Sequence, residues 1–367
     1  MAIHAELRAR LQGEPATWLV TGAAGFIGSN LLESLLALNQ QVIGLDNFTT
    51  GKRENLAAVE SAVGPAQWRH FRLIEGDIRS PGDCRAACRA VRYVLHHAAQ
   101  ASVPQSIEDP VSCHDSNVSG FLNMLVAARD AGVSRFVYAG SSAAYGDAAG
   151  LPAVEDDTGD ALSPYGLAKH VDELYAQLFA RCYGLASIGL RYFNVFGPRQ
   201  DPHGAYAAVI PLWVASVLAG QQVHINGDGE TTRDFCHVDN VVQANLLAAT
   251  VGEAAAVNQV YNIALGAGTT LTQLFETIRQ VLESRGALPG VRRPAYRGFR
   301  PGDVRHSQAD IGKAARLLGY RPTALLREGL ARTVDWYAGR PPAPHAAAGD
   351  CPDLRIGTQA MAASRLL

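Results

Sequence analysis

Short apolar runs alternate with amphipathic segments through residues 17–140 of the chain. The segments between the runs carry the three-to-four-residue spacing of helices that are apolar on one face. Strands that alternate with such helices form a parallel sheet covered on both faces. The sequence therefore predicts an α/β fold with a doubly wound parallel sheet. Its strands are expected at residues 17–21, 42–45, 70–74, 92–95 and 135–140, with another near 186–191.

The first predicted strand ends in a turn with three glycines, Gly22, Gly25 and Gly28, and a helical pattern begins at Phe26 and Ile27. A sharp turn and the close approach of a diphosphate to bare backbone both require glycine. The helix offers unpaired N–H groups and the positive end of its dipole to phosphate. This spacing is not the commonest dinucleotide fingerprint, and a plain turn is the alternative. The pattern predicts the first unit of a Rossmann-type fold.

The second predicted strand closes on Asp46, eighteen residues after Gly28. A carboxylate at this place accepts hydrogen bonds from the adenosine ribose hydroxyls and repels a 2′-phosphate, which favours NAD over NADP. Lys52 and Arg53 in the next loop would soften that preference, and an Asp that only caps a strand end is the alternative. Strand, glycine turn, helix, strand and Asp46 in this order predict an NAD site.

Two further strand ends carry signals of the same site. Gly76-Asp77-Ile78 follows the third predicted strand, where Asp77 can accept a hydrogen bond from the adenine amino group. The small residues of the segment 97–101 follow the fourth strand and let backbone pass close to a cofactor. Each segment alone reads more simply as a loop. Their order along successive strands is what predicts one cofactor cleft.

Tyr165 and Lys169 lie in a predicted helix that begins at Ser163 and Pro164, residues suited to an N-cap and a first helical position. Positions i and i+4 share one helix face, so the phenol oxygen and the ammonium group can point into one site. Removal of hydride from an alcohol carbon also requires a base for the hydroxyl proton. One cation about 4 Å from a phenolate stabilises it by on the order of 4 kcal/mol at an effective dielectric near 20.

Ser141 and Ser142 follow the apolar strand at 135–140, where a hydroxyl can share a hydrogen bond with Tyr165 and with a substrate oxygen. A Tyr-x-x-x-Lys pair by itself more often marks a solvated helix face. Preceded by the glycine turn and the two serines, it predicts a hydride-transfer site. In this site Tyr165 is the base and Lys169 stabilises its phenolate.

These motifs together resemble the extended short-chain dehydrogenase/reductase family, and within it the nucleotide-sugar 4-epimerases, from about residue 17 to 340. The resemblance extends to the segments 191–198, 234–239 and 300–304. It implies NAD as cofactor, a UDP-sugar as substrate, and a 4-keto intermediate whose C4 receives hydride back on its other face. It also implies that the catalytic residues are Ser141, Ser142, Tyr165 and Lys169.

The resemblance further implies which residues hold the two ligands, with arginines on the diphosphate and Asp303 on the uridine ribose. A guanidinium fork matches phosphate oxygens. The residues implied for NAD are Gly22, Gly25, Phe26, Ile27, Gly28, Asp46, Asn47, Gly51, Asp77, Ile78, Ala98, Ala99, Gln100, Asn117, Tyr165, Lys169 and Tyr192. The residues implied for the UDP-sugar are Ser102, Ser141, Ser142, Asn194, Val209, Arg233, Arg300, Asp303 and Ser307. No metal site is expected.

The residues after Ser141 distinguish the reactions within the family. Similar dehydratases carry an acidic pair at the positions of Ser142 and Ala143, and decarboxylases of the family place a Glu where Ala143 sits. Because alanine cannot move a proton, the resemblance favours an epimerase. A dehydratase or decarboxylase is one alternative. A cofactor-sensing or scaffold protein without turnover is another, although such proteins typically lose the tyrosine or lysine.

Ser307 corresponds to the position that gates the sugar pocket, where a bulky residue excludes a 2-acetamido group. The N-terminal segment and residues 45–51 most resemble bacterial surface-polysaccharide epimerases of the Vi-antigen or O-antigen type. The expected activity is therefore conversion of UDP-N-acetylglucosamine (UDP-GlcNAc) to UDP-N-acetylgalactosamine (UDP-GalNAc). The corresponding uronic acid, which Arg305 and His306 would favour, and UDP-glucose remain alternative substrates.

The composition limits the possible partners and the cellular compartment but indicates no reaction. The 367 residues are 48% hydrophobic and 18% charged, with a formal net charge of −2, so neither nucleic acid nor an anionic membrane is an expected partner. No segment reads as a signal peptide or a membrane span, and the six scattered cysteines read as reduced thiols. We expect a cytoplasmic protein.

Pro- and Gly-rich segments from about residue 195 predict a smaller α/β lobe that binds substrate. A homodimer is expected through the helices near 113–130 and 165–182. The expected divisions are a leader at 1–16, an NAD-binding domain at 17–194 with a returning segment at about 232–262, a substrate lobe at 195–231 and 263–340, and a loosely ordered tail at 341–367.

Overall fold

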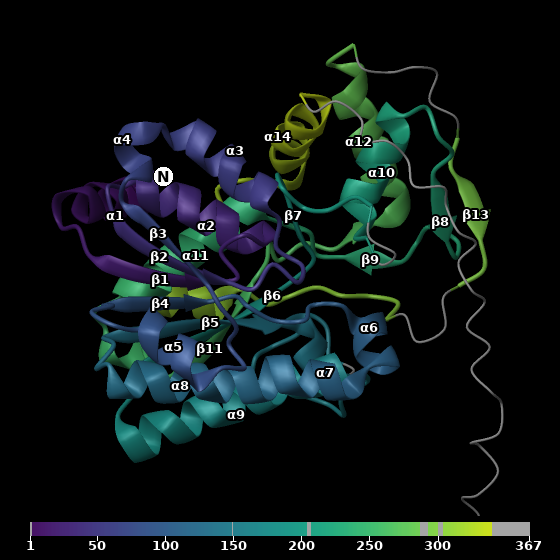
Figure 1. Cartoon of the computed structure of the whole chain (residues 1–367). Helices are drawn as coiled ribbons and strands as arrows, with labels where there is room; N and C mark the ends of the chain where they lie inside the picture. The colour runs from purple at the N-terminus through teal and green to yellow at the C-terminus, as the bar shows by residue number, and fades with distance from the viewer. Residues whose placement is uncertain (1, 149, 204–206, 287–292, 300–303, 340–367) are drawn as a thin grey trace, which may run out of the picture.

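The computed structural model describes residues 2–148, 150–203, 207–286, 293–299 and 304–339. A seven-stranded sheet runs through its middle in the order β11-β6-β5-β4-β1-β2-β3, and every neighbouring pair is parallel (Figure 1). The predicted doubly wound sheet is confirmed. Its strands are β1 (Thr17–Thr21), β2 (Gln41–Asp46), β3 (Phe71–Glu75), β4 (Tyr93–His96), β5 (Arg135–Ser141), β6 (Ser187–Tyr192) and β11 (Gln259–Ile263).

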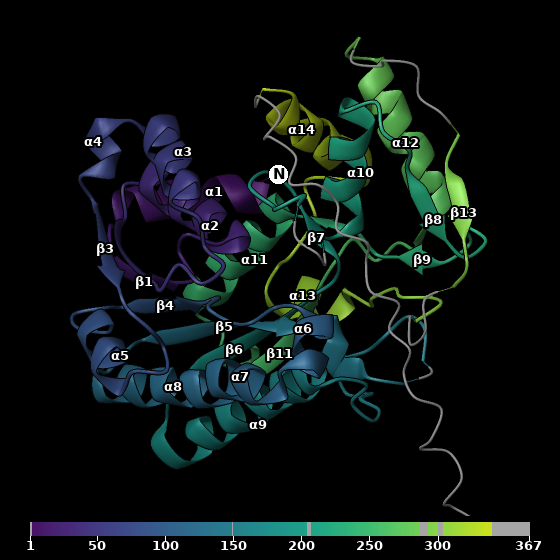
Figure 2. The ribbon, with the colours of Figure 1, turned by 45° about the vertical axis from the view of Figure 1, so that its right-hand side comes forward.

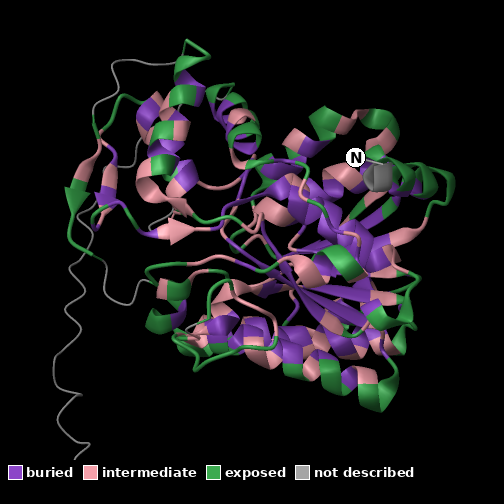
Figure 3. Ribbon diagram, turned by 180° about the vertical axis from the view of Figure 1, so that it is seen from behind, coloured by how far each residue is buried: buried purple, intermediate pink, exposed green. Residues whose placement is uncertain are grey.

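Helices cover both faces of this sheet, and a large apolar cluster lies on each side. Figure 3 shows the central strands almost entirely buried, with the exposed residues on the outer helices. One face carries α1 (Ala2–Gly13), α2 (Phe26–Ala37), α3 (Arg53–Val63), α4 (Pro65–Trp68) and α11 (Val238–Thr250). The other face carries α5 (Pro81–Ala87), α7 (Pro110–His114), α8 (Gly120–Asp130) and α9 (Pro164–Tyr183).

The N-terminal helix α1 packs into the core rather than standing apart from it. Leu7 and Leu11 are buried in the cluster that α2 and α11 also line. The Gln40 amide donates to the carbonyl of Leu11 at 2.7 Å, and its oxygen accepts from the Trp18 indole at 2.9 Å. These bonds tie α1 to the beginning of β1.

A third apolar cluster lies beyond the carboxyl ends of the strands and joins α10 (Val209–Leu218), α12 (Leu271–Glu283) and α14 (Leu326–Ala338) (Figure 2). Short paired strands accompany these helices: β7 (Val195–Phe196) with β10 (Cys236–His237), β9 (Thr232–Arg233) with β12 (Thr269–Thr270), and β8 (His224–Asn226) with β13 (Ala295–Arg297). The remaining elements are α6 (Val103–Glu108), α13 (Gly312–Leu317) and the 3₁₀ turns Ser142–Tyr145 and Ala254–Ala256. None of the helices that the structure describes is long and apolar enough to cross a membrane.

The helix expected over 110–131 is helical throughout but not uniform. A π-helical turn, Asp115–Ser119, joins α7 to α8. One extra residue in a turn shifts the side chains that follow, and such π-bulges often occur at functional sites. In this chain the turn carries Asn117, a predicted cofactor residue.

Candidate active site

The glycine turn brings β1 and α2 closer than any side chain would allow. Gly22 has a φ of +69° and its carbonyl accepts from the Gly25 N–H at 3.0 Å. A β-carbon at Gly28 would lie 2.0 Å from the Gly22 oxygen. Gly25 is the N-cap of α2 and makes no side-chain cap, so the amides of Phe26 and Ile27 are open to an anion.

Asp46 is held rigidly at the end of β2. Its two carboxylate oxygens accept from the backbone N–H groups of Ala24 and Phe48, each at 2.8 Å, and the side chain is buried. A β-carbon at Gly51 would lie 2.7 Å from this carboxylate. Each oxygen keeps a second lone pair, so the carboxylate caps its own loop and can still accept from a ligand.

The carboxyl ends of β1 to β4 enclose a cleft with a volume of about 260 Å³, which we call the cofactor cleft. It lies on the strand ends where dinucleotides bind in such folds. Predicted residues that line it are Gly22, Gly25, Asp46, Asn47, Gly51, Asp77, Ile78, Ala98, Ala99 and Gln100. Lining residues outside the list predicted for NAD include Thr49, Thr50, Arg79, His97, Gln105, Ser112 and Ser116.

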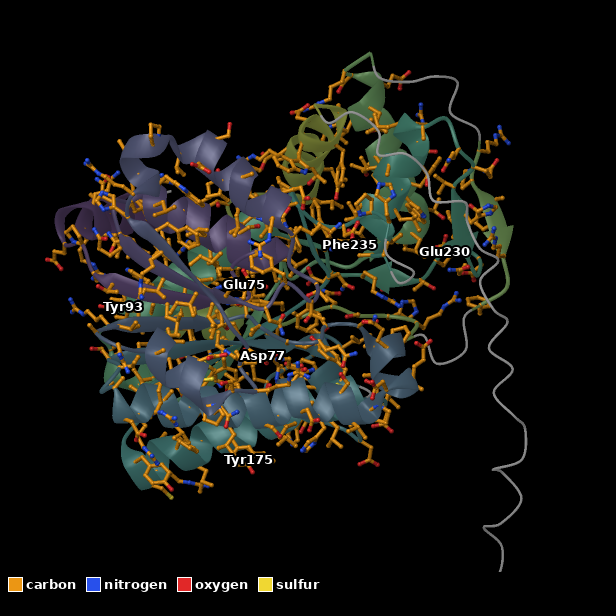
Figure 4. All side chains as sticks on the ribbon, viewed as in Figure 1. Glu75, Asp77, Tyr93, Tyr175, Glu230 and Phe235 are labelled. Carbon is orange, nitrogen blue, oxygen red and sulfur yellow. The ribbon has the colours of Figure 1, made fainter. Side chains whose placement is uncertain are left out.

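Asp77 lies after β3 near the middle of the molecule (Figure 4). The Arg79 guanidinium and the Asn47 amide both donate to its carboxylate, at 2.7 Å and 2.9 Å. Hydrogen bonding from Arg79 is the main cause that lowers the Asp77 pKa to about 2. The carboxylate is ionised and oriented, and its contact to adenine stays a prediction.

Two polar side chains brace the segment after β4. Asn117, on the π-helical turn, accepts from the Gln100 N–H at 2.7 Å and donates to the Gln100 carbonyl at 2.9 Å. The Asn245 amide donates to the Tyr192 hydroxyl at 2.8 Å, and that hydroxyl is also hydrogen-bonded to His97 Nε2 at 2.9 Å. Burial lowers the His97 pKa to about 3, which keeps the imidazole neutral.

The 3₁₀ turn Ser142–Tyr145, which follows Ser141, packs directly against α9. The Ser163 hydroxyl caps α9 by accepting from the Gly166 N–H at 3.0 Å, and Pro164 is its first residue, as the sequence predicted. A β-carbon at Gly166 would lie 2.6 Å from the Ala143 carbonyl. Tyr165, one residue before, donates its N–H to the Ser106 hydroxyl at 3.2 Å. The first turn of α9 thus rests on the turn that carries the serines.

Ser141 ends β5 and Ser142 begins the 3₁₀ turn after it. The Ser141 oxygen accepts from the Ala143 N–H at 3.1 Å. The hydroxyl proton of Ser141 therefore remains available to a second partner.

Lys169 is buried and its ammonium lies 3.2 Å from a carboxylate oxygen of Asp172, one turn along α9. Burial by itself would lower the Lys169 pKa. The charge and hydrogen bond of Asp172, together with an electrostatic interaction with Tyr165, outweigh burial and raise the Lys169 pKa, so the lysine is a cation.

A buried ion pair behind this site escaped the sequence analysis. Arg191 of β6 donates to both carboxylate oxygens of Glu173 at 2.8 Å and 2.7 Å, and to the Glu155 carbonyl at 2.8 Å. Bidentate pairs of this kind are geometrically specific. The pair fixes α9 against the sheet. Of its two residues, only Arg191 belongs to a segment that the sequence analysis singled out, residues 191–198.

The predicted substrate residues are spread over several elements. Arg233 donates to the Thr232 carbonyl at 2.8 Å, and the Ser307 N–H donates to the same carbonyl at 3.2 Å, so these two lie together. Ser102 caps α6, Asn194 donates to the Asp234 carbonyl at 3.1 Å, and Val209 begins α10. Arg300 and Asp303 lie outside the described residues.

The model of the NAD dependent epimerase/dehydratase family matches residues 18–264. The chain belongs to this family. A putative UDP-glucose 4-epimerase of Methanocaldococcus jannaschii is 39% identical over 320 residues, which is 87% of this chain and 97% of the relative. The predicted family and the dependence on NAD are confirmed.

Solved structures of family members have the same fold. UDP-glucose 4-epimerase from Thermotoga maritima, with UDP-glucose, has a TM-score of 0.79 and 39% identity, over 88% of this chain and 98% of that chain. UDP-N-acetylglucosamine 4-epimerase from Methanobrevibacter ruminantium, in complex with UDP-N-acetylmuramic acid, has a TM-score of 0.80 and 35% identity over the same shares. The two relatives are named for different sugars, so the family leaves the sugar open.

The residues of the cofactor cleft fit NAD. The turn at Gly22 and Gly28 leaves no room for a β-carbon beside an uncapped helix end, which suits a diphosphate. Lys52 is paired with Asp201 at 2.6 Å and Arg53 with Glu75 at 2.7 Å. With both cations paired and Asp46 at the strand end, this part of the cleft disfavours a 2′-phosphate.

Proposed function

We propose that this enzyme is an NAD-dependent UDP-sugar 4-epimerase and that its substrate is UDP-GlcNAc, which it converts to UDP-GalNAc. One observation carries the proposal. Tyr165 and Lys169 share a helix whose first turn packs on the Ser141 turn, and that turn offers a hydroxyl but no acid.

The residues divide the proton chemistry among them. When bound, NAD supplies a reversible hydride acceptor for C4 of the sugar. Tyr165, as phenolate, takes the proton of the C4 hydroxyl, and Ser141 bridges the two oxygens with its free proton. Lys169 stabilises the phenolate by charge. Because both faces of C4 react at one site, Tyr165 serves as base in one half of the reaction and as acid in the other.

Ser142 and Ala143 argue against a dehydratase or decarboxylase. Elimination of water from the sugar needs an acid and a base beyond Tyr165. Decarboxylases of the family have a Glu at the position of Ala143. Ala143 presents a backbone N–H bonded to Ser141 and a carbonyl packed on Gly166. Neither atom moves a proton, so return of hydride to C4 is the remaining outcome.

The surroundings of Ser307 favour an N-acetylated hexose over a uronic acid. Arg305 is paired with Asp228 at 2.6 Å and lies over the Phe299 ring at 5.1 Å. His306 is hydrogen-bonded through Nδ1 to the Thr232 hydroxyl at 3.0 Å. Both groups that would bind a C6 carboxylate are engaged, which supports UDP-GlcNAc over its uronic acid. UDP-GlcNAcA (its C6 uronic acid) and UDP-glucose remain the alternatives.

The deciding experiment is incubation of the purified protein with UDP-GlcNAc, without added cofactor, followed by proton NMR of the anomeric signals. We expect UDP-GalNAc to appear until the two sugars reach equilibrium. Conversion of UDP-GlcNAcA or UDP-glucose alone would keep the reaction and replace the substrate. If none of the three sugars reacts, with or without added NAD, the proposed function is wrong.

Substitution Ser307→Tyr tests the pocket. A phenol ring at this position occupies space that we assign to the 2-acetamido group, so kcat/KM for UDP-GlcNAc should fall about 100-fold or more, whereas that for UDP-glucose should fall far less. Ser61→Tyr on α3, where the serine is exposed, is the matched control and should leave both values unchanged. Equal losses for the two sugars would remove Ser307 from the pocket.

We also propose that the protein is a homodimer through the predicted helices near 113–130 and 165–182, the second of which is α9. Leu167, Leu174 and Leu178 form one stripe along α9 and are 52%, 50% and 40% exposed. Val111 of the adjacent α7 is 69% exposed. Such a contiguous apolar face fits a second copy, because both copies would bury the same stripe.

Leu174→Glu should convert this dimer to a monomer, since a carboxylate buried in the interface costs several kcal/mol. Size-exclusion chromatography with light scattering gives the mass. Leu325→Glu is the control, because Leu325 is similarly exposed at 56% but precedes α14. A monomeric wild type, or a Leu174→Glu protein that remains dimeric, would contradict the proposed interface.

The resemblance of residues 45–51 to bacterial surface-polysaccharide epimerases supports a role in that synthesis, in the cytoplasm, where UDP-sugars are made. We further propose the two-lobe division given above, with the third apolar cluster as the core of the substrate lobe.

A further inference from the structure

The helix that carries Tyr165 and Lys169 also carries a buried acid that the mechanism above does not use. Asp172 is 1% exposed, and its Oδ2 lies 3.2 Å from the Lys169 ammonium. Its other oxygen, Oδ1, has no hydrogen-bond partner among the described residues. A buried carboxylate with an unbonded oxygen destabilises the fold unless a nearby opposite charge compensates for its burial. Lys169 is that charge.

We propose that Asp172 is a positioning residue that holds the Lys169 ammonium and cancels part of its charge, and so sets the pH at which Tyr165 becomes a phenolate. This inference rests on the proposed role of Tyr165 as the base. An ionised Asp172 leaves a nearly neutral pair beside the phenol. A neutral Asp172 leaves a full cation there, which favours the phenolate more strongly.

Other titratable and charged groups also face Lys169 and Asp172. They are Tyr165 and Glu173 of α9, Cys113 of α7, His96 and His97 at the end of β4, Tyr138 of β5 and Arg191 of β6. Most of them keep one charge state near neutral pH. Burial lowers the pKa of both histidines and raises that of Cys113 and Tyr138, so all four are neutral. Glu173 and Arg191 neutralise each other at 2.7 Å.

Asp172 differs from these groups because its carboxyl group gains or loses its proton near neutral pH. Burial raises its pKa to about 7, against the opposite effect of the Lys169 charge. Below that pH the carboxyl is neutral and Lys169 acts fully on Tyr165. Above it the carboxylate opposes loss of the phenol proton. Formation of the phenolate is therefore displaced to higher pH in the wild type than with a neutral residue at 172.

The test is a pH titration of the NAD-loaded protein, read in two ways. Tyrosinate absorbance, with the signal of Tyr165→Phe subtracted, reports the proton on Tyr165 whether or not sugar turns over. The acid limb of kcat/KM reports it during catalysis. In Asp172→Asn and Asp172→Ser both transitions should move to lower pH by on the order of one unit. Asp172→Glu, which keeps the charge, should stay closer to wild type.

Asp130→Asn removes the same charge from the exposed end of α8 and should leave the transitions in place. Transitions that coincide in wild type and both neutral variants, or that move to higher pH, would overturn the proposal. So would failure of both variants to fold, since Asp172 would then be needed only for structure. Absence of turnover together with a shifted tyrosinate signal would instead count against the proposed function alone.

Discussion

Replacement of Tyr165 by Phe is expected to lower kcat by about 10³-fold or more while NAD remains bound. The ring keeps its packing at the start of α9, and only the oxygen that takes the C4 proton is lost. Among the described residues, the hydrogen bonds of the glycine turn and of Asp46 do not involve this oxygen. Turnover of UDP-GlcNAc by proton NMR, and NAD released from denatured protein, measure the two quantities.

Tyr183→Phe is the matched control, because Tyr183 ends the same helix and is 54% exposed. Its loss of a hydroxyl should leave turnover near wild type. Activity in Tyr165→Phe within a few-fold of wild type would show that another group is the base. Loss of NAD together with turnover would mean that the hydroxyl holds the cofactor rather than the substrate proton.

Gly28→Ala should abolish NAD binding and lower the free energy of unfolding by about 3 kcal/mol. The added carbon would lie 2.0 Å from the Gly22 oxygen and 2.7 Å from the Gly22 carbonyl carbon. These are backbone atoms, so the contact is relieved only if α2 moves away from β1, which opens the turn that receives the diphosphate. Urea unfolding and cofactor content after purification give the two effects.

The control is Gly252→Ala, which follows α11 and has no atom within 4 Å of the added carbon. Because bound NAD itself stabilises the folded chain, unfolding is compared with and without excess NAD. A Gly28→Ala protein that keeps stoichiometric NAD and the wild-type unfolding midpoint would show that the turn adjusts at little cost.

Some of the predicted site is held by contacts between positions far apart in the chain. Arg199, on the loop after β7, is buried and pairs with Glu33 of α2 at 2.7 Å, with further bonds to Ser29 and Asn30. Nothing in the local sequence near Arg199 indicates α2 as its partner, because about 170 residues separate them. Arg199 and Glu33 come together only when the folded chain packs the loop after β7 against α2.

The π-helical turn is a second feature that the local sequence does not predict. Residues 110–131 have one helical pattern, and the spacing of apolar positions does not reveal a single widened turn. In the structure that turn directs Asn117 to Gln100. The prediction that Asn117 serves the cofactor cleft came from resemblance, and the hydrogen bonds that let it do so came from the fold.

The amino-acid pattern was enough to predict the six strands, the glycine turn, Asp46 at its strand end and the Ser163 cap of α9. These features were readable because the spacing of apolar positions and the turn and cap residues are properties of short stretches of sequence. Three other features are visible only in the folded chain: β11 completes the sheet, Glu173 pairs with Arg191, and Asp172 faces Lys169 in a buried environment. The electrostatics of the site depend on burial, and burial depends on what the rest of the chain packs around each charge.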